Sequence, residues 1–230
     1  MSGDREAILG RIREALRVPA PRRHEAPATV PEGGKVTTSF REWLPAVGKK
    51  LDEQVALFAK MSAGLKTEFH ECADAAAAAK IIADLAAEGD WKRLSLHKGE
   101  LCDAVAAALP ESLELIRTDD GYDKNTLESC EGGLSECETL VAQTGSICVT
   151  ARSSGGRALS ALPPHHVVVA KRSQLVADLP AAYEQLAKRY GNNYPSFIGF
   201  ITGPSRTGDI ERILVLGAHG PKRLTVLLLP

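Results

Sequence analysis

Apolar residues near the start of the chain recur with a helical period. Ile8, Ile12 and Leu16 stand four residues apart within residues 4–17, which predicts that they share one face of a helix. Four prolines and few large apolar residues follow, so the next stretch favours an extended arm. We therefore expect an amino-terminal helix and a proline-rich arm in residues 1–34. This segment would dock on a neighbouring chain and allow an oligomer, or it would be a frayed terminus.

From residue 35 to residue 230 the pattern switches repeatedly between helical and strand periods, which predicts one α/β domain. Helices are expected at residues 51–65, 75–89, 100–109, 179–190 and 209–216, and strands at residues 93–96, 113–116, 166–170, 197–201 and 224–229. Asp74 is placed to cap the second of these helices. Such alternation is typical of a mainly parallel sheet with helices on both faces.

Two of these strands are almost continuously apolar. The runs at 166–170 and 224–229 suit central strands, because an edge position would leave their side chains in water. The helix at 209–216 would then form a right-handed crossover between the strands at 197–201 and 224–229.

One region breaks the alternation. Residues 137–151 contain two short β-type runs on either side of Gln143-Thr144-Gly145-Ser146, and glycine in the turn favours a hairpin. We expect this β-hairpin as an insertion in the α/β fold.

Charge and composition exclude several classes of protein. The chain has 28 Lys and Arg against 29 Asp and Glu, a formal net charge of -1, which gives no reason to expect a nucleic-acid partner. No run approaches the roughly 20 apolar residues that a membrane-spanning helix needs. No signal-peptide pattern opens the chain either. We therefore expect a cytoplasmic protein without a membrane span.

The five cysteines are scattered, and no two of them form a Cys-x-x-Cys pair. This spacing predicts no iron–sulfur cluster, no metal and no other cofactor in this chain. In the alternative, Cys130 and Cys137 would converge with His165 as metal ligands from separate loops.

The polar turn at residues 203–211 is the first candidate site. In open α/β sheets, ligands bind where strands end and helices begin. Free amides at the start of the predicted helix would point at such a ligand, and an arginine would bind its carboxylate or phosphate. The residues expected to contribute are Gly203, Pro204, Ser205, Arg206 and Thr207. The alternative is a well-capped helix start, in which Thr207 or Gly208 is the N-cap and Arg206 pairs with Asp209.

Further candidate residues lie between the hairpin and the last strand. Arg157 follows the tight turn at Gly155-Gly156 and offers a second guanidinium group for an anion. His165 and His166 stand at the start of a predicted strand, either as ligands or as hydrogen-bonded structural residues. His219 lies in a glycine-flanked loop before the last strand.

Three stretches resemble the lactate utilisation protein C family, whose members are LUD-domain proteins. They are QTGSICVTARSSGGRALSALPPHHVVVAKRSQLV at 143–176, FITGPSRTGDIERILVLGAHGPKRL at 200–224 and the terminal TVLLL. The family's Pro-Ser-Arg-Thr-Ala-Asp-Ile-Glu run is found at 204–211 with Gly208 in place of alanine, and its Gly-Val-His-Gly-Pro run at 217–221. The family also has a Glu-Thr-Gly-Ser/Thr pattern in the hairpin. This chain has Gln143 in place of the glutamate of that pattern.

The resemblance implies a three-layer α/β/α fold like that of ribose-phosphate isomerase, glucosamine-phosphate deaminase and the CoA transferases. It also implies a role in oxidising L-lactate to pyruvate beside two iron–sulfur partner proteins. In such an assembly, the polar turn at 203–211 would be the site that binds a small anion. The additional candidates are the ligand-binding residues Thr144, Gly145 and Ser146 and the catalytic residues Asp209, Glu211 and His219. Two alternatives remain open: a free-standing enzyme of this superfamily acting on a phosphate-, CoA- or folate-type anion, and a non-catalytic assembly module.

Overall fold

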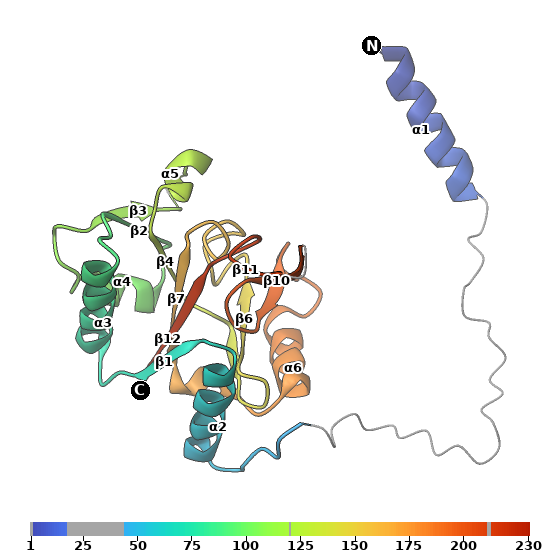
Figure 1. Ribbon diagram of the computed structural model, residues 1–230. Helices are drawn as coiled ribbons and strands as arrows, with labels where there is room; N and C mark the ends of the chain where they lie inside the picture. Colours follow the sequence, from blue (N-terminus) through green and yellow to red (C-terminus); the bar gives the residue numbers. More distant parts are fainter. Residues whose placement is uncertain (1, 18–43, 120, 211–212) are drawn as a thin grey trace, which may run out of the picture. The chain divides into compact units, whose positions relative to one another are not determined.

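The computed structural model describes residues 2–17, 44–119, 121–210 and 213–230 of the chain (Figure 1). Residues Met1–Phe40 and Arg41–Pro230 form two separate compact units. The first contains helix α1 (Ser2–Arg17), which confirms the helix predicted at residues 4–17. The proline-rich arm lies outside the described residues, and the domain boundary after residue 34 stays a prediction.

A six-stranded parallel sheet forms the centre of the second unit. Its strands are β1 (Glu68–Glu71), β2 (Arg93–Leu96), β3 (Glu114–Arg117), β4 (Gly132–Ser135), β7 (His165–Lys171) and β12 (Arg223–Leu229). They lie in the order β1-β12-β7-β4-β2-β3, and every neighbouring pair is parallel. β7 and β12 are interior strands and almost fully buried, as their apolar sequences predicted.

Helices cover both faces of this sheet, which confirms the predicted three-layer α/β/α fold (Figure 1). Helices α3 (Ala75–Glu88) and α4 (Glu100–Ala106) pack on one face, and α2 (Leu51–Gly64) packs on the other. Side chains along β7 alternate between the two cores, because successive residues of a strand point to opposite faces. Val167 and Val169 join the core under α3 and α4, whereas Val168 and Ala170 join the core under α2.

The predicted hairpin is present and belongs to a second, four-stranded sheet. β5 (Thr139–Val141) and β6 (Ser146–Thr150) are its antiparallel arms, and β8 (Leu175–Val176) and β9 (Ile198–Ile201) complete the order β8-β5-β6-β9. Apolar side chains of this small sheet share the core with α2. Helix α6 (Leu179–Tyr190) packs Leu186 and Tyr190 against Cys148 of β6. The remaining helices of the described residues are short: α5 (Lys124–Glu128) and the 3-10 helix η2 (Arg172–Gln174).

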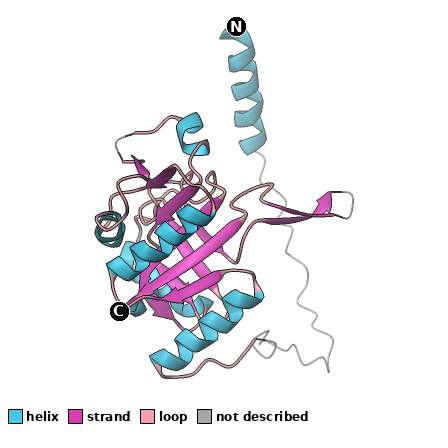
Figure 2. Cartoon of the chain, turned by 60° about the vertical axis from the view of Figure 1, so that its left-hand side comes forward, coloured by secondary structure: helices cyan, strands magenta, loops and turns pink. Residues whose placement is uncertain are grey.

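Two predictions near the carboxyl terminus are wrong. The strand predicted at 197–201 forms as β9, but it pairs antiparallel with β6 and does not join the parallel sheet. The segment predicted as a crossover helix at 209–216 forms an antiparallel hairpin of β10 (Arg206–Ile210) and β11 (Ile213–Leu216), separate from both larger sheets (Figure 2). Short apolar runs fit a helix and a strand equally well by period, and the β-branched residues of this segment favour the strand.

Strand β4 has no apolar pattern that would have predicted it, because close packing determines its sequence. A Cβ atom on Gly133 would lie 2.8 Å from the carbonyl oxygen of Leu159, so no larger residue fits there without movement.

No described helix combines the length and the apolar character that crossing a bilayer requires.

Candidate functional site

The predicted turn at 203–211 does not lead into a helix, so no helix amides point at a ligand there. Thr207 lies in β10 opposite Val215 of β11. It therefore cannot be a helix N-cap, and the capped-helix alternative is wrong together with the helix-amide part of the anion site. The backbone of Asp209 belongs to β10, but its side chain and the whole of Glu211 lie outside the described residues.

Several predicted residues nevertheless meet in one cavity of about 460 Å³, which we call the loop cavity. Three separate stretches of the chain contribute to it. Its predicted members are Arg157, Gly203, Ser205, Arg206 and His219. The structure therefore brings the two candidate arginines and the candidate histidine to one place, although it removes the helix that was expected to support them.

The backbone of the turn is held against the end of α2. Gly203 has φ +90, and a Cβ atom on it would lie 2.8 Å from the carbonyl oxygen of Leu65. The guanidinium group of Arg206 donates a hydrogen bond to the same carbonyl. The backbone N–H of Ser205 donates to the carbonyl oxygen of Pro221 at 2.9 Å, which holds the loop of His219 beside the turn.

Arg157 lines the same loop cavity from a separate stretch of the chain. Its Nη2 donates to the carbonyl oxygen of Ser196 at 3.3 Å, and its guanidinium carbon lies 5.6 Å from the ring centroid of Phe197. An arginine has five N–H donors, so one backbone hydrogen bond leaves several for a ligand. The side chains of Arg157, Arg206 and His219 are all exposed.

The hairpin motif approaches this cavity through a chain of hydroxyl groups but does not line it. The hydroxyl oxygens of Thr144 and Ser146 lie 2.8 Å apart, and that of Ser146 lies 2.8 Å from Thr202 Oγ1. Thr202 is the member of this chain that lines the loop cavity. Gly145 packs against the backbone of α2, and Pro204 is half-buried outside the cavity lining.

His165 and His166 are buried structural residues at the amino end of β7, away from the strand ends where ligands bind in such sheets. His165 Nε2 lies 2.8 Å from Thr225 Oγ1, and His166 Nε2 lies 2.8 Å from Ser135 Oγ. Burial lowers the pKa of His165 to about 4 and that of His166 to about 3. Both imidazoles are therefore neutral at physiological pH.

The described residues also argue against the alternative metal site at Cys130, Cys137 and His165. All five cysteines are buried with free thiols, and burial raises the pKa of Cys137 well above its usual value. Within the described ranges, no group of three His, Cys, Asp or Glu side chains is arranged to hold a metal ion.

A second cavity, of about 320 Å³, lies at the carboxyl ends of β2 and β4. We call it the strand-end cavity. Its lining includes His97 and Lys98, which follow β2, and Glu136 and Glu138, which follow β4. Arg152, Arg189 and Tyr190 close it from the side of the small sheet and α6. This is the place where open parallel sheets bind their ligands.

Backbone hydrogen bonds fix the floor of the strand-end cavity. His97 Nε2 accepts a hydrogen bond from the backbone N–H of Glu136 at 3.2 Å, which links the two strand ends. Glu136 Oε1 accepts from the backbone N–H groups of Leu101 and Cys102, at 2.8 and 3.2 Å, in the first turn of α4. Glu136 therefore caps α4, and its conformation is determined by the fold.

Sequence reasoning missed the residues of the strand-end cavity. One signal was available, because His97 and Lys98 directly follow the correctly predicted strand at 93–96. Glu136 and Glu138 follow β4, whose Gly132-Gly133 start gave no strand pattern. Arg152 and Arg189 come from a loop and from α6, and only the tertiary fold brings them together.

In a comparison with known protein families, residues 55–229 match the family model described as LUD domain. A lactate utilization protein C from Geobacillus kaustophilus is 35% identical over 100 residues, which are 42% of this chain and 41% of that protein. One from Deinococcus radiodurans is 30% identical over 120 residues, 52% of this chain and 56% of that protein. These matches span well under two thirds of the relatives' lengths.

A crystal structure of a DUF162 family protein from Deinococcus radiodurans has the same fold. It superposes with a TM-score of 0.62 at 21% sequence identity. The match covers 80% of this chain and 100% of that chain. At this identity the likeness establishes the fold and does not bear on the ligand.

Proposed function

Because the chain belongs to the LUD domain family, we propose that it acts in lactate utilisation and binds a small carboxylate anion in the loop cavity. The relatives named lactate utilization protein C support the first part. By resemblance to that family, the chain would work beside iron–sulfur proteins that carry out the electron transfer, and would itself hold no cluster.

One observation supports the proposed anion site. Two arginines and a hydroxyl group from separate stretches of the chain line one cavity. Arg157, Ser205 and Arg206 line the loop cavity, and His219 lies at the same place. A planar guanidinium group matches the two oxygens of a carboxylate, and two such groups favour an anion over a neutral ligand. The cavity, at about 460 Å³, has room for a small organic acid.

The test is a titration of the full-length protein with acetate, followed by NMR. The double variant Arg157→Gln/Arg206→Gln should bind acetate at least about tenfold more weakly, because each lost charge-assisted hydrogen bond contributes about 1.5–3 kcal/mol. Arg13→Gln is the matched control, because Arg13 is also an exposed arginine but lines neither cavity. Unchanged acetate affinity in the double variant would reject the loop cavity as the anion site.

The proposed role in an assembly is tested separately. The tagged full-length chain should co-purify with iron–sulfur proteins from cells grown on L-lactate, and the captured fraction should carry the absorption of such clusters. If the chain is recovered alone from these cells, the proposed partnership fails, and the anion site remains open to its own test.

A further inference from the structure

Strand β9 is an edge of the small sheet, and its outer side is unpaired within the described residues. The strand order is β8-β5-β6-β9, so β9 has β6 on one side only. Just before the strand, the backbone N–H of Ala151 donates to the carbonyl oxygen of Phe197 at 3.0 Å. Backbone groups along an antiparallel strand point alternately toward and away from the partner strand, so every second residue from Phe197 faces β6. Ile198 and Phe200 therefore present their N–H and C=O groups at the free edge.

This edge lacks the features that usually keep another strand from adding to a sheet. Folded proteins protect their edge strands with charged side chains, prolines, bulges or very short strands. The opposite edge strand, β8, is only two residues long. β9 has the sequence Ile-Gly-Phe-Ile, is half-buried at every position, and pairs with β6 without a bulge. The unprotected edge indicates that β9 receives a strand from another molecule.

One face of the β9 edge borders an apolar groove of about 380 Å³, which we call the aromatic groove. It is lined by Tyr183 and Leu186 of α6, by Tyr194, and by Ile198 and Phe200 of β9. Tyr183 and Tyr194 are 58% and 49% exposed, so two large aromatic side chains of the groove face solvent. The ring centroids of Tyr183 and Phe200 lie 5.3 Å apart. Exposed aromatic residues gathered around one groove are typical of a protein-binding surface.

The other face of the β9 edge carries positive charge. Phe197, directly before β9, and Ile201 line the loop cavity, because alternate residues of a strand point to opposite faces. The guanidinium carbon of Arg157 lies 5.6 Å from the ring centroid of Phe197, and Arg157 Nη2 donates to the carbonyl oxygen of Ser196. Among the described residues, the lining of the loop cavity includes no carboxylate that would neutralise Arg157.

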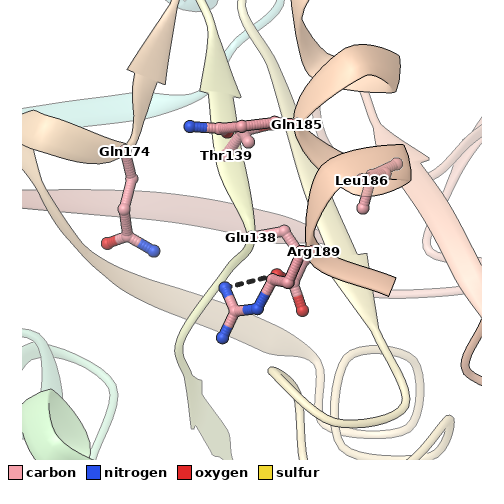
Figure 3. Close-up of a pocket in the computed structure, with 6 residues that line it drawn as sticks. All are labelled: Glu138, Thr139, Gln174, Gln185, Leu186 and Arg189. Atoms are coloured by element: carbon pink, nitrogen blue, oxygen red, sulfur yellow. Dashed lines mark ion pairs between the residues drawn. The ribbon is translucent and has the colours of Figure 1, made fainter. Parts of the chain in front are cut away.

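The arginine of α6 does not bring charge to the aromatic groove. Arg189 lines a different cavity, where its Nη1 lies 2.7 Å from a carboxylate oxygen of Glu138. Figure 3 shows this ion pair beside α6. The two faces of the β9 edge therefore differ in chemistry: one is apolar and aromatic, and the other is positively charged at Arg157.

We propose that β9 is the docking edge for an extended segment of a partner protein in which apolar and acidic side chains alternate. The segment adds a strand to the small sheet and pairs with the free backbone groups of Ile198 and Phe200. Because side chains of a strand alternate between its faces, the apolar ones enter the aromatic groove and the acidic ones meet Arg157. The added strand is antiparallel, which continues the β5-β6-β9 pattern and is slightly the more stable pairing.

This inference goes beyond the proposed binding of a small carboxylate. It requires the positive charge of Arg157 beside the edge, and it does not require a ligand within the loop cavity. The aromatic groove, which determines the apolar half of the partner sequence, lies outside the proposed anion site.

The probe is the peptide acetyl-Leu-Glu-Leu-Glu-Leu-Glu-amide, titrated into the full-length protein and followed by NMR. It should bind at least about tenfold more tightly than acetyl-Leu-Leu-Leu-Glu-Glu-Glu-amide, which has the same composition and charge but mixes the two kinds of side chain on each face. Lysines in place of the glutamates should also weaken binding at least about tenfold, because they would meet Arg157.

N-methylated peptides test the backbone pairing itself. In the antiparallel arrangement, the leucines lie opposite Ile198 and Phe200, and their N–H groups point at β9. N-methylation of the leucines should therefore abolish binding. N-methylation of the glutamates should have little effect, because their N–H groups point away from the sheet.

Two variants of the protein test the two faces. Tyr183→Ser and Arg157→Gln should each weaken the alternating peptide at least about fivefold. Tyr122→Ser and Lys188→Gln are the matched controls, since each removes an exposed tyrosine or cation that lines neither surface, and they should leave the affinity unchanged. Thermal melts check that every variant remains folded. Tyr183→Ser should also leave acetate binding unchanged, so that the docking edge and the proposed anion site are tested separately.

Several results would overturn the proposal. These are absence of binding of the alternating peptide, equal affinity for the two leucine–glutamate peptides, unchanged affinity after Tyr183→Ser, and the opposite order of the two methylated peptides. Analytical ultracentrifugation of the free chain tests a second copy as the occupant. A dimer that Tyr183→Ser dissociates would also overturn the proposal, because another copy of this chain would then cover the edge.

Discussion

At the scale of single residues, Gly203 determines where the loop cavity lies. Its φ of +90 is in the left-handed region, and the position of its missing side chain is taken by the Leu65 carbonyl at the end of α2. Arg206 donates to that same carbonyl, so the arginine and the turn share one anchor. The dipeptide Gly203-Pro204 indicated a turn from sequence alone. The partner of the turn, the Leu65 carbonyl just after α2, could not be predicted because the contact is tertiary.

Replacing Gly203 with alanine should destabilise the protein by about 2–4 kcal/mol. Roughly 1–2 kcal/mol comes from the left-handed backbone, and the rest from the clash with Leu65. Gly156→Ala is the matched control, since Gly156 has φ +103 but nothing lies within 4 Å of its missing Cβ. It should cost only the backbone part. Urea unfolding measures both, and equal losses for the two variants would show that the Leu65 contact is unimportant.

At the scale of elements, the sequence predicted best where local signals agree with the fold. Helix α3 has alanine-rich propensity, an apolar face and a cap, and it forms one residue short of the predicted range. The segment 209–216 had an equally plausible helical period, but it forms part of the β10–β11 hairpin. Period alone does not decide the structure of a short apolar run.

The cap of α3 should contribute about 1 kcal/mol. Asp74 accepts a hydrogen bond of 2.8 Å from the backbone N–H of Ala77, and its charge lies at the positive end of the helix dipole. Asp74→Ala should therefore lower the free energy of unfolding by about 0.5–2 kcal/mol. Asp84→Ala, at an exposed position in the same helix, removes the same charge without a cap and should be neutral or slightly stabilising. A reversed order of these two effects, measured by urea unfolding, would contradict the role of the cap.

At the scale of the whole molecule, the fold was largely predictable and the sites only in part. The parallel sheet follows from alternating helix and strand patterns, and the candidate residues of the loop cavity were recognised as polar motifs. The strand-end cavity was not, because Glu138, Arg152 and Arg189 come together only when the small sheet packs beside the main one. A motif can be recognised in a sequence, whereas the convergence of separate stretches of the chain depends on the tertiary structure.

The purified chain should contain much less than one iron or zinc per molecule. The thiolate is the form that binds these metals, and burial raises the pKa of Cys148 to about 12. The cysteine spacing also matches no cluster or zinc motif. Metal analysis after anaerobic purification provides the measurement, with a known iron–sulfur protein as the positive control. A content near one metal per chain would refute the expectation.

Acidification should destabilise the fold because the adjacent histidines of β7, His165 and His166, are buried. Burial lowers the pKa of His165 to about 4 and that of His166 to about 3, against about 6.5 in an unfolded chain. The unfolded chain therefore binds more protons below pH 6.5, so stability is full above this pH and falls as the pH decreases toward 4. Between about pH 7 and about pH 5 carboxylates of ordinary pKa stay charged, and the two histidines should cost about 2–4 kcal/mol of unfolding free energy. Urea unfolding across this range gives the slope, and NMR gives the imidazole titrations. Histidine signals of the folded protein from these two positions that titrate near pH 6.5 would exclude this mechanism.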